Sequence, residues 1–475
     1  MAVQFIELYL GILYSQKLGA SGIGLFQIMM SIYGLATALG VGGYSVAVTR
    51  LVSKNTELYG GKSAAFSVKK ALVCSFFTAM VVALLLNLGA EYIAVNYIKS
   101  TKMILPLKIL SFTLLPMSAS VCFSSYYITM GKIKTIGIIT LFSEFINIYL
   151  VIRLMKLLSF TFTGKCAAIT LSVLISEIFS AILSFIIFSL EKKKEENPIK
   201  TKAKSVFEIS APICAGATLK SFLNMLQNML IPWGFIKYGL SKAESVNNYG
   251  IIKGMAIPVV VFPAALMSSF LTLLIPEISK AYETKNEEKI SHAIIKASAV
   301  TMIFSVALTG IYIFFGEELG IAFYNNYAAG KYIKILAPLT AFMFLDDVVD
   351  SALKGMNEQI YSLKVNICEA AVRVVLLYLL LPLTSVTGYV FVIFLGNILN
   401  FILSYIRLSK ISSIYIDIPN WIIKPILIIL ICCITVKTAF PMNNINIIAL
   451  GIRLFSVLST YIFICIKCRC LKSAK

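Results

Sequence analysis

The sequence contains few charged residues for its length. Asp, Glu, Lys and Arg make up 13% of its 475 residues, whereas 59% are hydrophobic; soluble domains average about 25% charged residues. This composition excludes a soluble globular domain. Apolar runs of about twenty residues recur along the chain, each long enough to cross a bilayer as a helix. They do not alternate with period two, as barrel strands would, so we predict an all-α polytopic membrane protein.

The sequence has only one His, and its ten Cys form no clear ligand set. Seven Cys lie in apolar runs and are typical of small buried hydrophobic side chains. The terminal CIKCRC (Cys465–Cys470) resembles a metal knuckle, but no His or second Cys pair lies near it. We therefore expect no metal site and no cofactor, apart from a coupling Na⁺ or H⁺.

The net charge of +20 does not indicate a nucleic-acid partner. The Lys residues fall mostly between the apolar runs, where membrane topology explains them. Alternate loops are richer in Lys and Arg, which predicts that both chain termini lie on the cytoplasmic side of the cell membrane. No cleavable signal peptide is recognisable. The first apolar segment, Met1–Tyr14, would cover only ~21 Å, so it is either a short helix or continues from sequence upstream of Met1.

About fourteen transmembrane helices are predicted, and they contain an internal repeat. A shift of about 225 residues aligns Gln27 with Lys253 and Glu144 with Glu369. The repeat predicts an N-terminal six-helix bundle (1–190), a cytoplasmic linker (191–204) and a C-terminal six-helix bundle (205–410). Two extra transmembrane helices and a basic tail would follow (411–475). Bundles of six helices are related by a pseudo-two-fold axis along the membrane normal, bind substrate between them and work by alternating access.

The stretch FLDDVVDSALKG (Phe344–Gly355) carries three carboxylates in a predicted span. Ionisable groups at membrane depth normally face a cavity or a partner. Helix rise places Asp346 and Asp347 at a depth similar to that of Glu369 and Arg373 in the next span. Either Asp350 pairs with Lys354 and Glu369 with Arg373 and these pairs fix the hairpin, or a surplus carboxylate binds a coupling H⁺ or Na⁺, or the cluster is simply wetted by the cytoplasmic opening. The candidate ion-coupling residues are Asp346, Asp347, Glu369 and Asp350.

Four stretches resemble the stage V sporulation protein B and polysaccharide-exporter family. They are LGASGIGLFQIMMSIYGLATALGVGGYSVAVTRLVSKN (Leu18–Asn55), YGIIKGMAIPVVVFPAALMSSFLTLLIPEISKA (Tyr249–Ala281), LAPLTAFMFLDDVVDSALKGMNEQIYSLKVNI (Leu336–Ile367) and GYVFVIFLGNILNFILS (Gly388–Ser404). The resemblance implies two six-helix bundles around a central cavity. It also implies movement of a polyprenyl-pyrophosphate-linked saccharide across the membrane in spore cortex or cell-wall synthesis, with cell-wall synthesis proteins as candidate partners.

The sequence departs from that family in three places. The first span lacks the Arg that relatives direct into the cavity. SSYY (Ser124–Tyr127) replaces a motif that is roughly Arg-Gly-Tyr-Phe in relatives. Gln227 and Asn228 stand where relatives tend to carry an acid. These differences favour a paralogue with a different substrate or reduced activity.

Four cations are candidates for binding a pyrophosphate: Lys220, Arg373, Arg50 and Lys253. Lys220 should lie ~21 Å from the start of its helix, with no acid one turn away along it; alternatively, it pairs with Glu144, Glu177 or another helix. Lys253 is expected near the outer mouth and Arg50 near the cytoplasmic mouth. Arg50 could instead serve only as a positive-inside anchor.

The sequence supports a flippase more strongly than other classes. The alternative within transport is a Na⁺- or H⁺-coupled multidrug antiporter of the same fold, which would favour an acidic and aromatic lining. A membrane enzyme is disfavoured because the outer loops are short and His292 lies in an inside loop. A non-transporting scaffold for a sporulation complex is a further alternative. The saccharide and the coupling ion are not specified by the sequence.

Overall fold

The structure is a computed structural model that describes residues 2–59, 64–158, 161–191, 203–412, 417–440, 447–468 and 470. Every regular element in these ranges is a helix, which confirms the all-α fold class. Eleven helices are long and apolar enough to cross a membrane. Most of the predicted linker, 192–202, and the end of the predicted tail, 471–475, lie outside the described residues.

Two of the eleven helices are too long for one crossing. The run Ala2–Thr56 has 55 residues and Gln359–Ser409 has 51, roughly 75–80 Å at 1.5 Å per residue, against a hydrocarbon core of ~30 Å. The first run bends at Gly19, with φ 71°, and again at Gly43, with φ 83°, and the second bends at Ser385, with φ 53°. Each run can therefore provide two crossings. A further run, interrupted at Pro338, covers 327–355. The described residues thus accommodate the fourteen predicted spans.

Backbone contacts divide the chain into two compact units. The N-terminal unit comprises residues 2–10 and 17–229, and the C-terminal unit comprises residues 11–16 and 230–475. The division falls inside two helices: the helix Ala2–Val41, of which residues 11–16 join the C-terminal unit, and the helix Ala203–Tyr238, between Met229 and Leu230. Residues 411–475 belong to the C-terminal unit.

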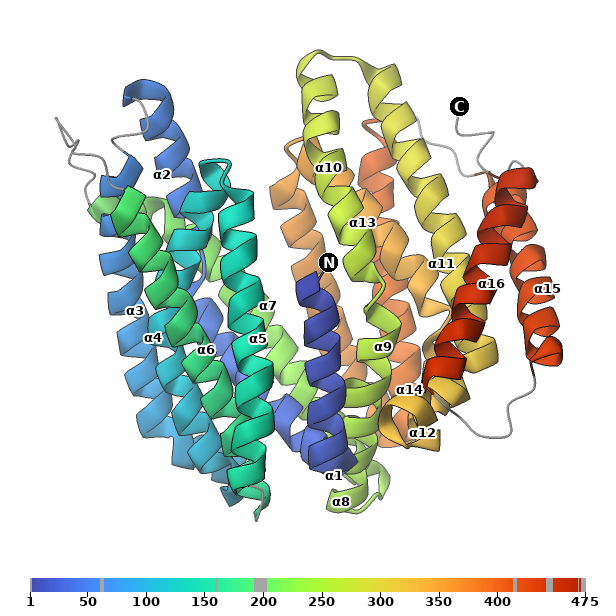
Figure 1. The fold of residues 1–475 in the computed structure, drawn as a ribbon, viewed down its shortest axis with the longest axis horizontal. Helices are drawn as coiled ribbons and strands as arrows, with labels where there is room; N and C mark the ends of the chain where they lie inside the picture. The colour runs from blue at the N-terminus through green and yellow to red at the C-terminus, as the bar shows by residue number, and fades with distance from the viewer. Residues whose placement is uncertain are drawn as a thin grey trace. The chain divides into compact units, whose positions relative to one another are not determined.

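The N-terminal unit is a bundle of seven α-helices (Figure 1). They are α1 (Ala2–Val41), α2 (Tyr44–Tyr59), α3 (Ala64–Tyr92), α4 (Ile104–Thr129), α5 (Ile133–Leu158), α6 (Phe162–Glu191) and α7 (Ala203–Tyr238). A π-helical turn, Ile93–Tyr97, and a 3₁₀ turn, Thr101–Met103, connect α3 to α4. Helix α4 packs against α2, α3 and α6 and is therefore central in this unit.

Aromatic side chains form much of the core of the N-terminal unit. Phe123, Tyr126 and Phe188 pack with ring centroids 5.2–5.3 Å apart, and all three are buried. The hydroxyl of Tyr127 donates to the Ser184 carbonyl at 3.1 Å. Tyr126 and Tyr127 belong to the SSYY stretch, so these two aromatic residues support packing between α4 and α6.

Gly43 allows the chain to pass from α1 to α2 against the backbone of α7. Its φ of +83° lies in the region that L side chains rarely adopt, and an added Cβ would lie 2.4 Å from the Ser210 carbonyl oxygen. Both the turn and the close approach of the two backbones therefore require glycine at this position.

Replacing Gly43 with Ala should destabilise the N-terminal unit. Forcing a side chain into this conformation costs about 1–3 kcal/mol, and the clash with the Ser210 carbonyl adds to it. The measurement is the thermal unfolding midpoint of the detergent-solubilised protein. Gly34→Ala is the matched control, because a Cβ there meets nothing within 4 Å; equal midpoints for the two variants would contradict the assignment.

The C-terminal unit contains the remaining helices. They are α8 (Lys242–Tyr249), α9 (Ile257–Val261), α10 (Ala264–Glu283), α11 (Glu287–Tyr324), α12 (Tyr327–Leu336), α13 (Leu339–Gly355), α14 (Gln359–Ser409), α15 (Lys424–Ala439) and α16 (Ile447–Lys467). Two π-helical segments, η3 (Gly250–Ala256) and η4 (Pro419–Ile423), precede α9 and α15. Helix α11 contacts α10, α12, α13, α15 and α16 and is the central helix of this unit.

The apolar run of the eighth predicted span starts near residue 250, but the helix that contains it begins earlier, at Lys242. Ser241 and Glu244 form a capping box, in which Ser241 Oγ accepts from Glu244 N at 3.2 Å and Glu244 Oε2 accepts from Ser241 N at 3.1 Å. The Ser241 hydroxyl also donates to Glu244 Oε2 at 2.7 Å. The cap starts a polar turn of helix, α8, that continues directly into η3. Hydropathy could not indicate this turn because its residues are mostly polar.

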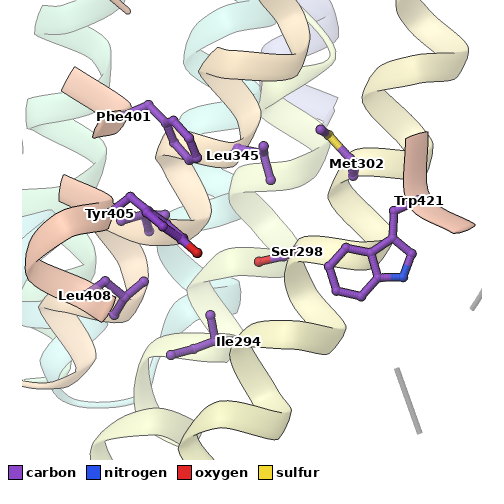
Figure 2. A pocket seen from close by; sticks show the side chains of 9 residues that line it. Ile294, Ser298, Met302, Leu345, Phe401, Tyr405, Leu408 and Trp421 are labelled. Atoms are coloured by element: carbon purple, nitrogen blue, oxygen red, sulfur yellow. The ribbon is translucent and has the colours of Figure 1, made fainter. Parts of the chain in front are cut away.

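Trp421 is part of an apolar cluster of side chains in the C-terminal unit (Figure 2). Its indole is fully buried and lies among side chains of α11, α13 and α14. These include Ile294, Ser298, Met302, Leu345, Phe401, Tyr405 and Leu408. The cavity between these side chains measures ≈ 10 Å³, about the space of one water molecule, so it is too small to hold a substrate.

Helices α15 and α16 are attached to α11 (Figure 1). Tyr461 Oη donates to the Ile303 carbonyl at 2.8 Å, and Lys437 Nζ donates to the Phe314 carbonyl at 3.2 Å. The buried Arg453 of α16 lies 3.8 Å from Glu318 of α11. Polar contacts therefore fix the two additional helices along much of one helix.

Candidate functional site

The hairpin of α13 and α14 contains both ion pairs predicted from i,i+4 spacing. Lys354 Nζ lies 2.5 Å from Asp350 Oδ2, and the Ser362 hydroxyl donates to Asp350. Arg373 pairs with Glu369, whose side chain is buried. Both predicted ion pairs therefore form.

The remaining two acids of the stretch are held separately. Asn400, in the second half of α14, donates to Asp346 Oδ2 at 2.8 Å. The Asp347 side chain is exposed. Among the described residues, no group of three or more His, Cys, Asp or Glu side chains is arranged to hold a metal ion. The four predicted ion-coupling residues therefore do not form one metal-binding cluster.

Gly396 brings the second half of α14 against the Arg373–Glu369 pair. A Cβ at this position would lie 2.6 Å from Arg373 Nε and 2.7 Å from Glu369 Oε1. The glycine leaves room for the pair between the two halves of α14. The second half of α14 therefore covers one side of the Arg373–Glu369 pair.

Lys253 lies in the π-helical segment η3. Its side chain is half-buried, and its charge is close enough to that of Arg373 for the two to repel. No ion pair or hydrogen bond involves the Lys253 side chain among the described residues. The carbonyl of the next residue, Gly254, accepts from Ser15 Oγ at 3.0 Å. Lys253 lies eleven residues after Lys242, where this helix begins. It is therefore farther from the start of the helix than a span that starts near residue 250 would place it.

The other two candidate cations are in the N-terminal unit. Arg50 is exposed on α2, and Lys220 is half-buried on α7. The structure does not bring either of them to Lys253 and Arg373 within one unit. The C-terminal unit thus holds two of the four candidate pyrophosphate ligands, and the N-terminal unit holds the other two.

The N-terminal unit contains an acidic cluster whose members Glu144 and Glu177 were considered from the sequence only as possible partners of Lys220. Glu144 of α5 interacts electrostatically with Glu7 of α1 and with Glu177 of α6. The side chain of Asn147 lies beside Glu144, and that of Ser120 lies beside Glu177. None of these carboxylates forms an ion pair among the described residues. Four helices therefore contribute to one group of polar side chains, in which Glu7 is exposed, Glu144 and Glu177 are half-buried and Asn147 is buried.

Several oxygens of this acidic cluster are buried without a hydrogen bond of good geometry. They are Ser120 Oγ, Asn147 Oδ1 and Glu177 Oε2, and Gln4 Oε1 in the first turns of α1 is another such atom. Asn147 is 7% exposed. Buried oxygens without donors are costly, and carboxylate, amide and hydroxyl oxygens are the ligands that hard cations prefer. The cluster can therefore accept a proton or a hard monovalent cation.

One sequence signal pointed to this cluster. Glu144 and Glu177 each lie in the interior of an apolar run, where an acid is a candidate functional residue by default. Helix periodicity could not predict that the fold brings these acids of α1, α5 and α6 near one another. Residues 7, 144 and 177 are too far apart in sequence for helix spacing to relate them.

Comparison with known proteins agrees with this architecture. Residues 242–379 match the MatE family. Stage V sporulation protein B of Bacillus subtilis (strain 168) is 19% identical over 432 residues, which cover 89% of this chain and 83% of that protein. Sporulation protein YkvU of the same organism is 21% identical over 158 residues, which cover 33% of this chain and 36% of that protein.

Solved structures show the same fold at low sequence identity. Lipid II flippase MurJ in an inward closed conformation aligns with a TM-score of 0.69 at 14% identity, covering 97% of this chain and 95% of that one. A multidrug resistance MATE family transporter of the MOP superfamily, in an inward-facing conformation, aligns with a TM-score of 0.66 at 14% identity, covering 86% and 96%. Residues 1–282, more than half of the chain, match the family described as polysaccharide biosynthesis protein. The chain is therefore a multi-pass membrane protein that belongs to the polysaccharide biosynthesis protein family and has the fold of MOP-superfamily transporters.

Proposed function

We propose that the protein is a transporter that moves a polyprenyl-pyrophosphate-linked saccharide across the cell membrane by alternating access. The observation that carries the proposal is the cation Lys253, half-buried in a π-helical segment beside Arg373. π-Helical turns inside helices occur frequently at functional sites. Two cations that repel each other inside a membrane protein are stabilised by an anion that binds both.

The neighbouring charges support a site for an anionic group. Arg373 is paired with Glu369, so the net charge of that pair is close to zero. The pair therefore does not compensate the charge of Lys253. A pyrophosphate has several acceptor oxygens and can bind a Lys ammonium and an Arg guanidinium together. The names of the relatives, a sporulation protein and a lipid II flippase, support a lipid-linked cell-wall precursor as the substrate class. Cytoplasmic placement of both termini remains part of the proposal.

The test is translocation of a fluorescent lipid-linked saccharide in reconstituted vesicles, read from its accessibility to an impermeant quencher. Lys253→Ala should slow translocation about tenfold or more, because a charge-assisted hydrogen bond contributes ~1.5–3 kcal/mol and 1.4 kcal/mol is a factor of ten. Lys253→Arg should retain most of the rate. Lys331→Ala, an exposed Lys of α12, is the control. Equal rates for Lys253→Ala and wild type would contradict the role of Lys253.

The acidic cluster supports transport that is driven by a cation gradient. We propose that Na⁺ or H⁺ binds at Glu144 and Glu177, with Glu7 and Asn147 close by. The acids of the hairpin, Asp346 and Asp347 above all, are the alternative coupling site. The same cluster also favours a second candidate function, a Na⁺- or H⁺-coupled multidrug antiporter. Gradient-driven export of cationic dyes, without translocation of the lipid-linked saccharide, would support that second function.

A further inference from the structure

The N-terminal unit contains an apolar cavity, and none of the candidate pyrophosphate or cation ligands lines it. Its volume is ≈ 640 Å³, within the ~300–1,000 Å³ typical of sites that hold small molecules. The second half of α1, the start of α2, α3 and α7 form its walls. All of its lining residues belong to the N-terminal unit, and the cavity is open rather than enclosed.

One face of α7 forms the longest wall of the cavity. Phe207, Ala211, Cys214, Thr218 and Phe222 line it, and their spacing of three or four residues places them on one side of the helix. The helix segment from Phe207 to Phe222 spans ~22 Å, about three quarters of a ~30 Å hydrocarbon core. Lys220 falls on the opposite side of α7 at 100° per residue. The cavity is therefore long and lacks the one cation of this helix segment.

Two of the polar side chains in the wall, Thr78 and Cys214, form hydrogen bonds within the bundle. Thr78 Oγ1 donates to the Gly40 carbonyl at 2.7 Å and lies 3.2 Å from Tyr44 Oη. Cys214 Sγ donates to the Ala38 carbonyl at 3.3 Å. No charged residue is among those that line the cavity. A sugar or an ion would lose its hydration there without replacement hydrogen bonds, whereas a hydrocarbon chain would lose nothing.

Basic residues flank one end of the cavity. Arg50 and Lys54 follow Tyr44 on α2 and are exposed, and Arg50 lies ~9 Å along the helix from Tyr44. Lys204 precedes Phe207 on α7; its side chain is 83% exposed and lies 3.9 Å from Glu208. Cations beside the end of an apolar cavity are complementary to a lipid with an anionic headgroup.

We propose that this cavity holds the polyprenyl chain of the transported lipid, with the pyrophosphate at the basic end near Arg50. The inference rests on the proposed function, because it takes the lipid part of that substrate as its ligand. It gives the N-terminal unit a separate task, which is to hold the chain, while Lys253 and Arg373 of the C-terminal unit bind the anion at another stage. Arg50 then contacts the substrate in addition to any role in topology.

Cys214 allows a direct test in the unmodified protein. Alkylation of Cys214 by N-ethylmaleimide is followed by mass spectrometry in detergent, with the exposed Cys368 of the C-terminal unit as the internal reference. A polyprenyl phosphate at ten times its Kd should slow Cys214 alkylation about tenfold, since the free fraction falls as 1 + [L]/Kd, and leave Cys368 unchanged. Inorganic pyrophosphate alone should not protect Cys214. Equal protection by phosphatidylglycerol, or none by polyprenyl phosphate, overturns the proposal.

A cavity-filling variant provides a second readout. Ala215 lines the cavity and is exposed to it, so Ala215→Phe should fill the space and reduce translocation of the lipid-linked saccharide at least about tenfold. Ile213→Phe, on the other side of α7, is the matched control. Protection of Cys214 without any translocation by the wild type would reject the transport function and retain the lipid site. Normal translocation by Ala215→Phe, with Cys214 unprotected, would reject the cavity assignment and retain the transport function.

Discussion

Arg373→Gln is expected to lower the free energy of unfolding by about 3–5 kcal/mol, because removing one member of a buried ion pair leaves the other charge uncompensated. Glu369 is 9% exposed, and Gly396 packs directly against both members of the pair. Little water can therefore replace the guanidinium. The measurement is the denaturant or thermal midpoint of the protein in detergent, followed by tryptophan fluorescence.

A double replacement separates this stability effect from substrate binding. Glu369→Gln combined with Arg373→Gln removes both charges and should recover most of the lost stability. Lys354→Gln breaks the other pair of the hairpin, where Lys354 is 44% exposed, and should cost less than about 1 kcal/mol. If Arg373→Gln costs no more than Lys354→Gln, the Arg373–Glu369 pair does not stabilise the hairpin. If the double variant is stable but translocates slowly, Arg373 also contacts the substrate.

Glu177→Gln is expected to remove the response of transport to an applied Na⁺ or pH gradient. The amide keeps the size of the side chain but cannot carry the charge that a cation neutralises. Coupling free energies between sites are typically 1–3 kcal/mol, or about 5–150-fold, so the gradient-driven rate should fall by a factor in that range. The measurement is translocation in vesicles with and without each gradient.

Two further variants decide where the cation binds. Glu208→Gln is the control, because Glu208 is an exposed acid of α7 that lies beside Lys204, and it should leave the gradient response intact. Asp346→Asn examines the hairpin alternative, in which Asp346 accepts from Asn400. Loss of coupling in Asp346→Asn together with a normal response in Glu177→Gln would place the cation site in the hairpin and reject the acidic cluster.

Local patterns in the sequence predicted much of the fold and the nearest charge pairs. The i,i+4 pairs Asp350–Lys354 and Glu369–Arg373 form as expected, because both partners lie on one helix and spacing alone brings them together. Apolar runs likewise located most spans. The helix of the eighth span begins before its apolar run because a capping box, not hydropathy, starts α8 at Lys242.

Contacts between helices that lie far apart in the sequence could not be predicted from the sequence. Glu7, Glu144 and Glu177 interact electrostatically only because the fold brings these parts of α1, α5 and α6 near one another, and nothing in their spacing indicates it. The placement of Asn400 beside Asp346 likewise depends on how the two halves of α14 fold back at Ser385. The apolar cavity is also a product of packing, since its α7 stripe alone is indistinguishable from an ordinary buried helix face.

The attachment of α15 and α16 to α11 has a practical consequence. Tyr461, Lys437 and Arg453 all bond to residues of that one helix, so a rigid displacement of the C-terminal unit carries both helices with it. A fluorophore placed at the exposed Cys468, just after α16, is thus an optical reporter for the C-terminal unit alone. Paired with a dye on α3, it would turn the transport cycle into a distance signal that can be followed in single molecules.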